Sequence, residues 1–259
     1  CNPAGAEIPP RALDGCDAVV NLAGESISNR WTRQTRRRIV ESRVSSTRLL
    51  ASECARNNVP VLVNASATGI YGDRGDGILD ESSPCGGGFL ADTCVAWEHA
   101  LRPAREAGIR TVPCRFGVIL SRTGGALPKM LPAFKVGLGG PLGSGQQWMP
   151  WIHIDDAVRA IERVLQDPAI DGPVLATSKH PIRQSEFARR LSESCGRKMR
   201  LRTPAWLLRL ALGAMADELL LSSQRCEASM LKSTDFVWAF PDLEKALDDL
   251  LPETNPVGR

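Results

Sequence analysis

The sequence predicts an α/β fold with a doubly wound parallel sheet, on the evidence of two short apolar runs and one long helix. Residues 59–64 and residues 17–21 each have the length and the Val-rich composition of a strand that is buried on both faces of a parallel sheet. Residues 31–57 between them are predicted to form a helix. Strand, helix and strand in this order form a right-handed crossover unit, from which parallel sheets are built.

Both apolar runs end in small residues, and this favours a ligand site. Residues 65–69 are Ala-Ser-Ala-Thr-Gly, and residues 22–24 are Leu-Ala-Gly. Ligands of open α/β sheets bind at the carboxyl ends of the strands, where small side chains let them approach the backbone. Ser66 and Thr68 add hydroxyl groups that can donate to a carbonyl or sugar oxygen. The alternative is an ordinary strand exit with turn-forming residues, and the residues alone do not decide between the two.

The same residues resemble those of a known family. Asn-Leu-Ala-Gly at 21–24 and Ala-Ser-Ala-Thr-Gly-Ile-Tyr-Gly-Asp at 65–73 are similar to strands four and five of the extended short-chain dehydrogenase/reductases, the NAD(P)-dependent sugar epimerases and dehydratases. The chain most resembles an atypical branch, the epimerase family proteins, which carry a small C-terminal domain of unknown function. The resemblance implies a Rossmann-like NAD(P)-binding domain over residues 1–181 and a small α-rich C-terminal lobe over residues 182–259.

Composition sets limits on the class of protein. Hydrophobic residues make up 43% of the chain and charged residues 24%, as in ordinary globular proteins, and the net charge of +3 gives no reason to expect a nucleic-acid or membrane partner. No apolar run approaches the roughly 18 residues that a spanning helix needs. The eight cysteines form no Cys-x-x-Cys pair. We therefore expect reduced thiols in a cytoplasmic protein, with no metal site.

The helix predicted over residues 31–57 is rich in arginine, which raises the alternative of nucleic-acid binding. Ile39, Val40 and Val44 give the helix an apolar face, and the arginines occupy the opposite face. The pattern therefore favours an amphipathic helix on the surface of the domain over a nucleic-acid interface.

The N-terminal region lacks the phosphate-binding signature of a dinucleotide fold. No Gly-x-Gly-x-x-Gly precedes residue 17, whereas the family that the chain resembles carries this turn before the equivalent strand. We therefore expect the domain to be N-terminally incomplete, with the first βαβ unit missing. We also expect this chain to bind NADP(H) or NAD(H), the cofactors that the resemblance implies, weakly or not at all.

The resemblance places the cofactor contacts at three strand exits, the third of which follows the strand predicted over residues 110–116. This strand resembles strand six of the family, which ends beside the nicotinamide. The implied cofactor-binding residues are Leu22, Ala23, Gly24, Glu25, Ala65, Ser66, Ala67, Thr68, Arg115, Phe116, Gly117 and Val118.

The catalytic Tyr-x-x-x-Lys pair of the family is absent. In the family the tyrosine transfers a proton, and the lysine lowers the pKa of that tyrosine and holds the nicotinamide ribose. Alignment on Glu98 puts Leu90 and Cys94 at these two positions, and neither can perform that chemistry. The predicted catalytic residues are Ser66, as the donor that polarises a substrate oxygen, and Tyr71, the only tyrosine, as one candidate proton donor.

Two further segments predict residues on the substrate side. Glu81 begins Glu-Ser-Ser-Pro, which resembles an acidic segment of the family near the substrate. His153 belongs to Trp-Ile-His-Ile-Asp-Asp, which resembles the strand that introduces the next helix, where the two aspartates would cap the helix N-terminus. The alternative for His153 is a hydrogen-bonded core histidine. Met149 lies where extended members carry an arginine against a nucleotide diphosphate, which weakens the case for a nucleotide-sugar substrate.

Residues 204–222 are apolar on nearly all sides, so we expect them to be buried against the main domain or against a second subunit of a homodimer. The resemblance predicts an NAD(P)(H)-dependent oxidoreductase or epimerase-like enzyme that acts on a small carbonyl or sugar-like molecule. The alternative is a non-catalytic dinucleotide-binding or sensor protein, because the acid/base pair is missing.

Overall fold

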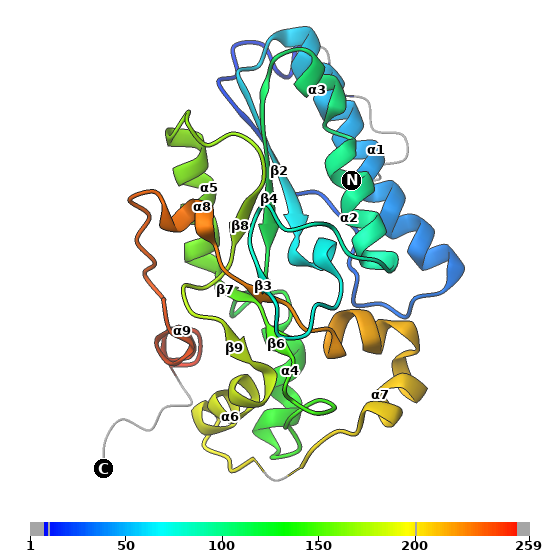
Figure 1. Ribbon diagram of the computed structural model, residues 1–259, viewed down its shortest axis with the longest axis vertical. Helices are drawn as coiled ribbons and strands as arrows, with labels where there is room; N and C mark the ends of the chain where they lie inside the picture. Colours follow the sequence, from blue (N-terminus) through cyan, green and yellow to red (C-terminus); the bar gives the residue numbers. More distant parts are fainter. Residues whose placement is uncertain (1–7, 10, 200, 253–259) are drawn as a thin grey trace.

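A computed structural model describes residues 8–9, 11–199 and 201–252 and contains a central sheet of four parallel strands. The strand order is β1-β2-β4-β8, and all three neighbouring pairs are parallel (Figure 1). The strands are β1 (Val19–Asn21), β2 (Val61–Ala67), β4 (Arg110–Phe116) and β8 (Val174–Ala176). The parallel sheet confirms the predicted α/β class.

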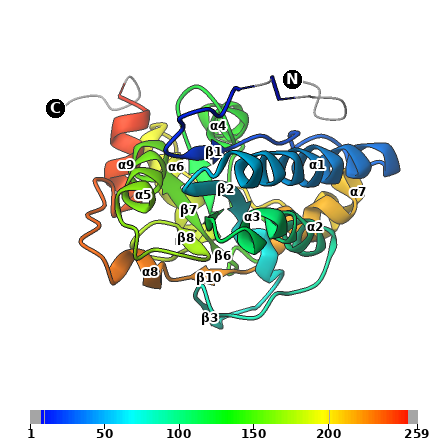
Figure 2. The same ribbon diagram turned by 90° about the horizontal axis from the view of Figure 1, so that it is seen from above.

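Helices cover both faces of this sheet (Figure 2). Leu62 faces the helices α1 (Arg33–Asn57) and α3 (Arg102–Glu106), because it shares a buried cluster with their side chains. Val61 and Val63, its neighbours in β2, belong to the cluster that includes α5 (Ile154–Gln166). Successive side chains of a strand point to opposite faces of the sheet, so both faces of β2 are covered by helices. This explains why the sequence of β2 is a nearly continuous apolar run.

Helix α1 has a capping residue at each end. The Thr32 hydroxyl accepts a hydrogen bond from the Thr35 backbone N–H over 3.1 Å, which caps the first turn. Asn58 ends the helix in the left-handed conformation, with φ of 50°. Ile39 is fully buried, as the apolar pattern predicts, while Arg37 on the outer face pairs with Glu41.

The remaining elements surround the carboxyl edge of the sheet. Three small two-stranded sheets are present among the described residues: β3 (Ile78–Leu79) with β10 (Arg225–Cys226), β5 (Val118–Leu120) with β7 (Trp151–His153), and β6 (Trp148–Met149) with β9 (Ile182–Arg183). The helical elements are η1 (Thr68–Tyr71), α2 (Phe89–His99), α4 (Leu127–Lys135), α6 (Gln184–Ser194), α7 (Ala205–Leu212), the π-helix η2 (Ala216–Leu221), α8 (Ser229–Lys232) and α9 (Leu243–Leu250).

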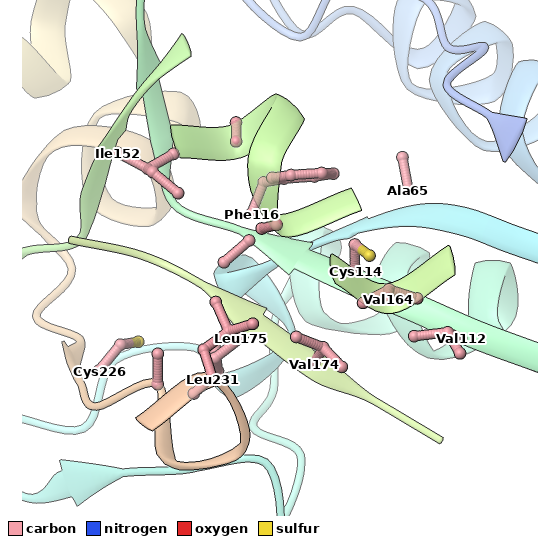
Figure 3. Close-up of a cluster of buried hydrophobic side chains, with 14 of the residues drawn as sticks. Ala65, Val112, Cys114, Phe116, Ile152, Val164, Val174, Leu175, Cys226 and Leu231 are labelled. Atoms are coloured by element: carbon pink, nitrogen blue, oxygen red, sulfur yellow. The ribbon is translucent and has the colours of Figure 1, made fainter. Parts of the chain in front are cut away.

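The chain after residue 181 is helix-rich and shares its core with the preceding part. Cys226 and Leu231 lie in the same buried cluster as Val174 and Leu175 of the central sheet (Figure 3). Two of its short strands, β9 and β10, pair with strands of the first part. The C-terminal lobe is therefore in direct contact with the carboxyl edge of the sheet and helps to shape it.

The apolar segment over residues 204–222 is only partly buried. Leu208 and Met215 are buried, and Leu219 is half-buried, whereas the side chains of Trp206 and Leu210 are 65% and 77% exposed. The prediction of burial against the main domain is wrong for Trp206 and Leu210, because α7 lies along the surface and turns only one side inward. Burial in a second subunit stays a prediction. No described helix is long and apolar enough to cross a membrane.

Candidate functional site

The carboxyl ends of β1, β2 and β4 come together at one edge of the sheet. Asn21 lies opposite Asn64, and Ala67 lies opposite Phe116, so the predicted cofactor segments follow three adjacent strands. Their exposure differs. Leu22, Ala23 and Gly24 are exposed; Glu25, Ala67, Gly117 and Val118 are half-buried; and Ala65, Ser66, Thr68, Arg115 and Phe116 are buried.

A buried amide network that the sequence analysis missed fixes the exit of β1. The Asn21 side-chain amide donates to Asn64 Oδ1 over 2.6 Å and to Thr47 Oγ1 over 3.0 Å. Asn21 Oδ1 accepts from the backbone N–H of Ala23 over 3.2 Å, and the Trp97 indole donates to Thr47 over 2.9 Å. The available signal was an Asn near the end of each of two strands otherwise made of apolar residues. The network orients the exposed segment that follows β1.

Arg43 of α1 hydrogen-bonds to the segment that follows β1. Its Nη1 donates to the backbone carbonyl of Glu25 over 3.0 Å, and the Glu25 N–H donates to the Ser42 hydroxyl over 3.0 Å. The Arg43 guanidinium lies 5.0 Å from the centre of the Trp97 ring. A side chain at Gly24 would come within 3.1 Å of this guanidinium, so the close approach favours glycine.

Ser66 hydrogen-bonds to a buried ion pair. Its hydroxyl donates to Glu98 Oε1 over 2.6 Å. Arg115 holds both oxygens of the same carboxylate, with Nε 2.9 Å from Oε1 and Nη2 3.0 Å from Oε2. Both side chains of the pair are about nine-tenths buried. A buried ion pair is stable only when its polar atoms are hydrogen-bonded, and here the bidentate Arg115 and the Ser66 hydroxyl supply partners for both Glu98 oxygens.

Tyr71 belongs to the same network. Its hydroxyl donates to the Asp80 carbonyl over 2.9 Å and accepts from Arg115 Nη1 over 2.8 Å. The ring is fully buried, and this burial raises the pKa of the Tyr71 hydroxyl above its ordinary value, against the opposing effect of Arg115. The structure thus brings the two predicted catalytic residues, Ser66 and Tyr71, into one network through Arg115. In this arrangement the hydroxyl proton of Tyr71 is hydrogen-bonded within the protein.

The hydroxyl groups of Ser66 and Thr68, both at the exit of β2, differ in their hydrogen bonding. A serine hydroxyl has one proton, so Ser66 cannot donate to a ligand without leaving Glu98. Thr68 follows at the start of η1, and its hydroxyl has no hydrogen-bond partner within the described part of the chain. Sequence alone could not distinguish Ser66 from Thr68, because the partner Glu98 lies 32 residues further along the chain.

Helix α2 carries Leu90 and Cys94, which the sequence analysis placed at the tyrosine and lysine positions of the family. Leu90 packs near Gly69, where a side-chain Cβ would lie 3.5 Å from Leu90 Cβ. Cys94 is buried, and burial raises the pKa of its thiol to about 12. Neither side chain can therefore transfer a proton at neutral pH.

His153, for which the sequence left a substrate-side position and a core position open, lies in the interior of the protein. The ring is 1% exposed and stacks on Phe240, with the ring centres 3.8 Å apart. Its Nδ1 accepts from the backbone N–H of Asp155 over 3.1 Å, which caps α5, and its Nε2 lies 3.2 Å from Asp249 Oδ2. Both ring nitrogens are thus engaged, and His153 is a core histidine that connects α5 to the C-terminal lobe.

The carboxylates near the site also have internal roles. Glu81 Oε1 accepts from the backbone N–H groups of Leu175 and Met230 over 3.0 and 3.1 Å, which joins β8 to α8. Its substrate-side role stays a prediction. Asp156 is fully buried and accepts from the N–H groups of Ala239 and Phe240, a role beyond the capping expected of it. Among residues 8–9, 11–199 and 201–252, no group of three His, Cys, Asp or Glu side chains could hold a metal ion.

The fold and this edge define a Rossmann-like α/β protein with its ligand edge at the exits of β1, β2 and β4. The model of the NAD-dependent epimerase/dehydratase family matches residues 10–174, and the model of a domain of unknown function, DUF1731, matches residues 203–250. The chain belongs to the NAD-dependent epimerase/dehydratase family, in the branch that carries this C-terminal domain.

Individual relatives agree with this assignment. The chain is 41% identical to epimerase family protein Mb2239 of Mycobacterium bovis over 95% of its own length and 82% of the relative. It resembles the crystal structure of human epimerase family protein SDR39U1 (isoform 2) with NADPH, at a TM-score of 0.88 and 31% identity, over 93% of this chain and 83% of that one. It also resembles a nucleoside-diphosphate sugar epimerase from Corynebacterium glutamicum, at a TM-score of 0.77 and 35% identity, over 93% of this chain and 47% of that one.

Proposed function

We propose that the protein is an NADP(H)-dependent oxidoreductase or epimerase-like enzyme that acts on a small carbonyl or sugar-like molecule. The observation that carries the proposal is the convergence of three strand exits, with small side chains and an exposed backbone at residues 22–24, at one edge of a parallel sheet. The human relative whose structure contains NADPH supports NADPH as the first cofactor to test.

The residues of this edge fit the nicotinamide half of a dinucleotide better than its phosphates. Bound NADPH would supply a hydride, and the chain would supply orientation and a polar setting for the substrate oxygen. Thr68 offers a hydroxyl that has no hydrogen-bond partner among the described residues, while Ser66, Glu98 and Arg115 connect β2, α2 and β4. Gly-x-Gly-x-x-Gly is absent from the sequence before β1, and we infer that the chain as given binds the cofactor weakly.

A second candidate function is that of a non-catalytic dinucleotide-binding or sensor protein. It is favoured by the burial of Tyr71 and by the apolar groups at positions 90 and 94, which leave no tyrosine or lysine to exchange a proton. We further propose a small-molecule substrate, no nucleic-acid or membrane partner, a cytoplasmic location and a homodimer. The free cysteines of the described chain agree with a reducing compartment.

Cofactor oxidation separates the two candidate functions. The protein is incubated with NADPH and, separately, NADH against a panel of aldehydes, ketones and keto-sugars, and absorbance at the reduced-nicotinamide band is followed. An enzyme oxidises NADPH with at least one compound in a protein-dependent manner. Binding of NADPH without turnover on any compound would contradict the enzymatic proposal and support the sensor.

A matched pair of variants tests the two hydroxyl groups on the compound that gives turnover. If Ser66 polarises the substrate oxygen in the transition state, Ser66→Ala lowers kcat with little change in cofactor affinity. If Thr68 is the donor, Thr68→Val has that effect, while Ser66→Ala chiefly lowers the unfolding temperature, because it removes a hydrogen bond to a buried carboxylate. Unchanged kcat in both variants would remove both residues from the proposed chemistry.

A further inference from the structure

Arg225 lies on a short strand that the C-terminal lobe contributes beside the candidate site. Strand β10 pairs in parallel with β3, and Arg225 lies opposite Ile78. The preceding residue, Gln224, donates its backbone N–H to the carbonyl of Trp148 over 3.1 Å. Strands β3, β10 and β6 are therefore adjacent, as Figure 2 also shows, and the position of the Arg225 backbone is fixed on both sides.

Among the residues that the structure describes, the side chain of Arg225 has no hydrogen-bond or ion-pair partner. Its guanidinium carbon lies 4.8 Å from the centre of the Trp148 ring, and the residue is half-buried. Its Nε is enclosed and makes no hydrogen bond, and within the described part of the chain neither Nη atom has a hydrogen bond or ion pair. A guanidinium has five donors and an obligatory charge, so an unpaired one in a partly enclosed position is ready to bind an acceptor.

A second arginine stands against the same ring and already holds a carboxylate. The Arg183 guanidinium carbon lies 4.2 Å from the Trp148 ring centre, and its Nη1 lies 2.8 Å from Asp76 Oδ1. The Trp148 indole N–H donates to the same oxygen over 3.0 Å. Asp76 is 72% exposed, on the loop between η1 and β3. Two arginines and one aspartate leave the cluster with one uncompensated positive charge.

The cluster borders the carboxyl edge of the central sheet. Asp76 lies five residues after Tyr71, the end of the segment that leaves β2. Trp148 is separated from β7 by Pro150, and a side-chain Cβ at Gly117, the residue that follows β4, would lie 2.9 Å from the Pro150 carbonyl. Short stretches of backbone therefore connect the Arg225 cluster to the exits of β2 and β4.

We propose that Arg225, stacked on Trp148 beside Arg183, binds an oxyanion, either a phosphate or a carboxylate group, of the small molecule on which the protein acts. Arginine binds both groups through paired N–H donors, and the Asp76 carboxylate already shows that the cluster accommodates such a group. The identity of the ligand as substrate rests on the proposed function, whereas the anion site itself does not.

Side-chain NMR of the 259-residue protein tests the site without cofactor or turnover. The Arg225 Nε–H and Trp148 Nε1–H resonances are followed during separate titrations with inorganic phosphate and acetate at constant ionic strength. Saturable shifts of both resonances are expected with at least one anion, and the stronger response tells whether phosphate or carboxylate is the preferred group. Absence of saturable shifts with both anions would overturn the proposal, even if the enzyme oxidises NADPH.

Three variants make the test specific. Arg225→Gln should weaken anion binding about tenfold or more, because it removes charge-assisted hydrogen bonds. Asp76→Asn should strengthen binding, because it removes the competing carboxylate from Arg183. Arg102→Gln, on the exposed surface of α3, serves as the matched control and should leave anion binding unchanged. Equal affinity in Arg225→Gln and the wild type, or weaker binding in Asp76→Asn, would contradict the assignment. If Arg225→Gln fails to fold, the Asp76→Asn result decides.

Discussion

At the scale of single residues, the candidate site depends on which polar atoms are already paired. Ser66 and Tyr71, the two predicted catalytic residues, lie at and just beyond the exit of β2. Their hydrogen bonds to Glu98, Arg115 and the Asp80 carbonyl could not be predicted, because these partners come from elements far apart in the chain. Periodicity finds the strand and the helix, whereas the register between them decides which side chains meet.

Because several cysteine thiols are buried, we expect the free energy of unfolding to fall at alkaline pH. Burial raises the pKa of Cys94, Cys114 and Cys226 to about 12 from an ordinary value of 9.0. The folded state therefore holds these protons more tightly than the unfolded state, so the stabilisation is complete below pH 9 and declines as the pH rises toward 12. Each thiol should lower the free energy of unfolding by up to about 1.4 kcal/mol per pH unit in that range.

Urea unfolding at a series of pH values between 8 and 10.5 measures this dependence. Cys114→Ala should flatten the alkaline decline, while Cys85→Ala, at an exposed position, is the matched control and should leave it unchanged. A decline of equal slope in Cys114→Ala and the wild type would show that the buried thiol does not contribute.

At the scale of elements, the strands and the long helix were predictable because their signals are local. The runs at 17–21 and 59–64 predicted β1 and β2, and the helix predicted over 31–57 corresponds to α1. The predicted burial of α7 is wrong for Trp206 and Leu210. An apolar composition does not show which side of a helix packs against the rest of the protein. Strand β10 was not predicted, since a strand of two residues has no periodicity to detect.

The two sides of α7 should differ in their contribution to stability. Leu208 is 9% exposed, so Leu208→Ala should lower the free energy of unfolding by about 2–4 kcal/mol. Leu210 is 77% exposed, so Leu210→Ala should change it by less than about 0.5 kcal/mol in the monomer. Urea unfolding of both variants provides the comparison.

The same variants test the proposed homodimer. If a second subunit covers Trp206 and Leu210, the cost of Leu210→Ala rises with protein concentration, because association stabilises only the folded state. Equal costs for Leu208→Ala and Leu210→Ala at the lowest concentration would contradict the orientation of α7 in a single chain.

At the scale of the whole molecule, the C-terminal lobe packs against the elements that follow the exit of β2. Glu81 receives N–H groups from both β8 and α8, and β10 pairs with β3 beside the exit of β2. The sequence indicated a boundary near residue 181 through the family resemblance, but it could not indicate that the later segment returns to the ligand edge. This return depends on contacts between residues more than 140 positions apart, such as Asp73 with Ser223.

The central claim is that NADPH binds at the exits of β1, β2 and β4, and an NMR titration of backbone amides tests it most directly. NADPH is added to the isotopically labelled 259-residue chain up to millimolar concentration, and the shifts of all amides are followed. We expect saturable shifts that concentrate at residues 22–25, 65–68 and 115–118, with a dissociation constant weaker than micromolar. The absence of shifts at these three segments, or a set of shifts centred elsewhere, would contradict it.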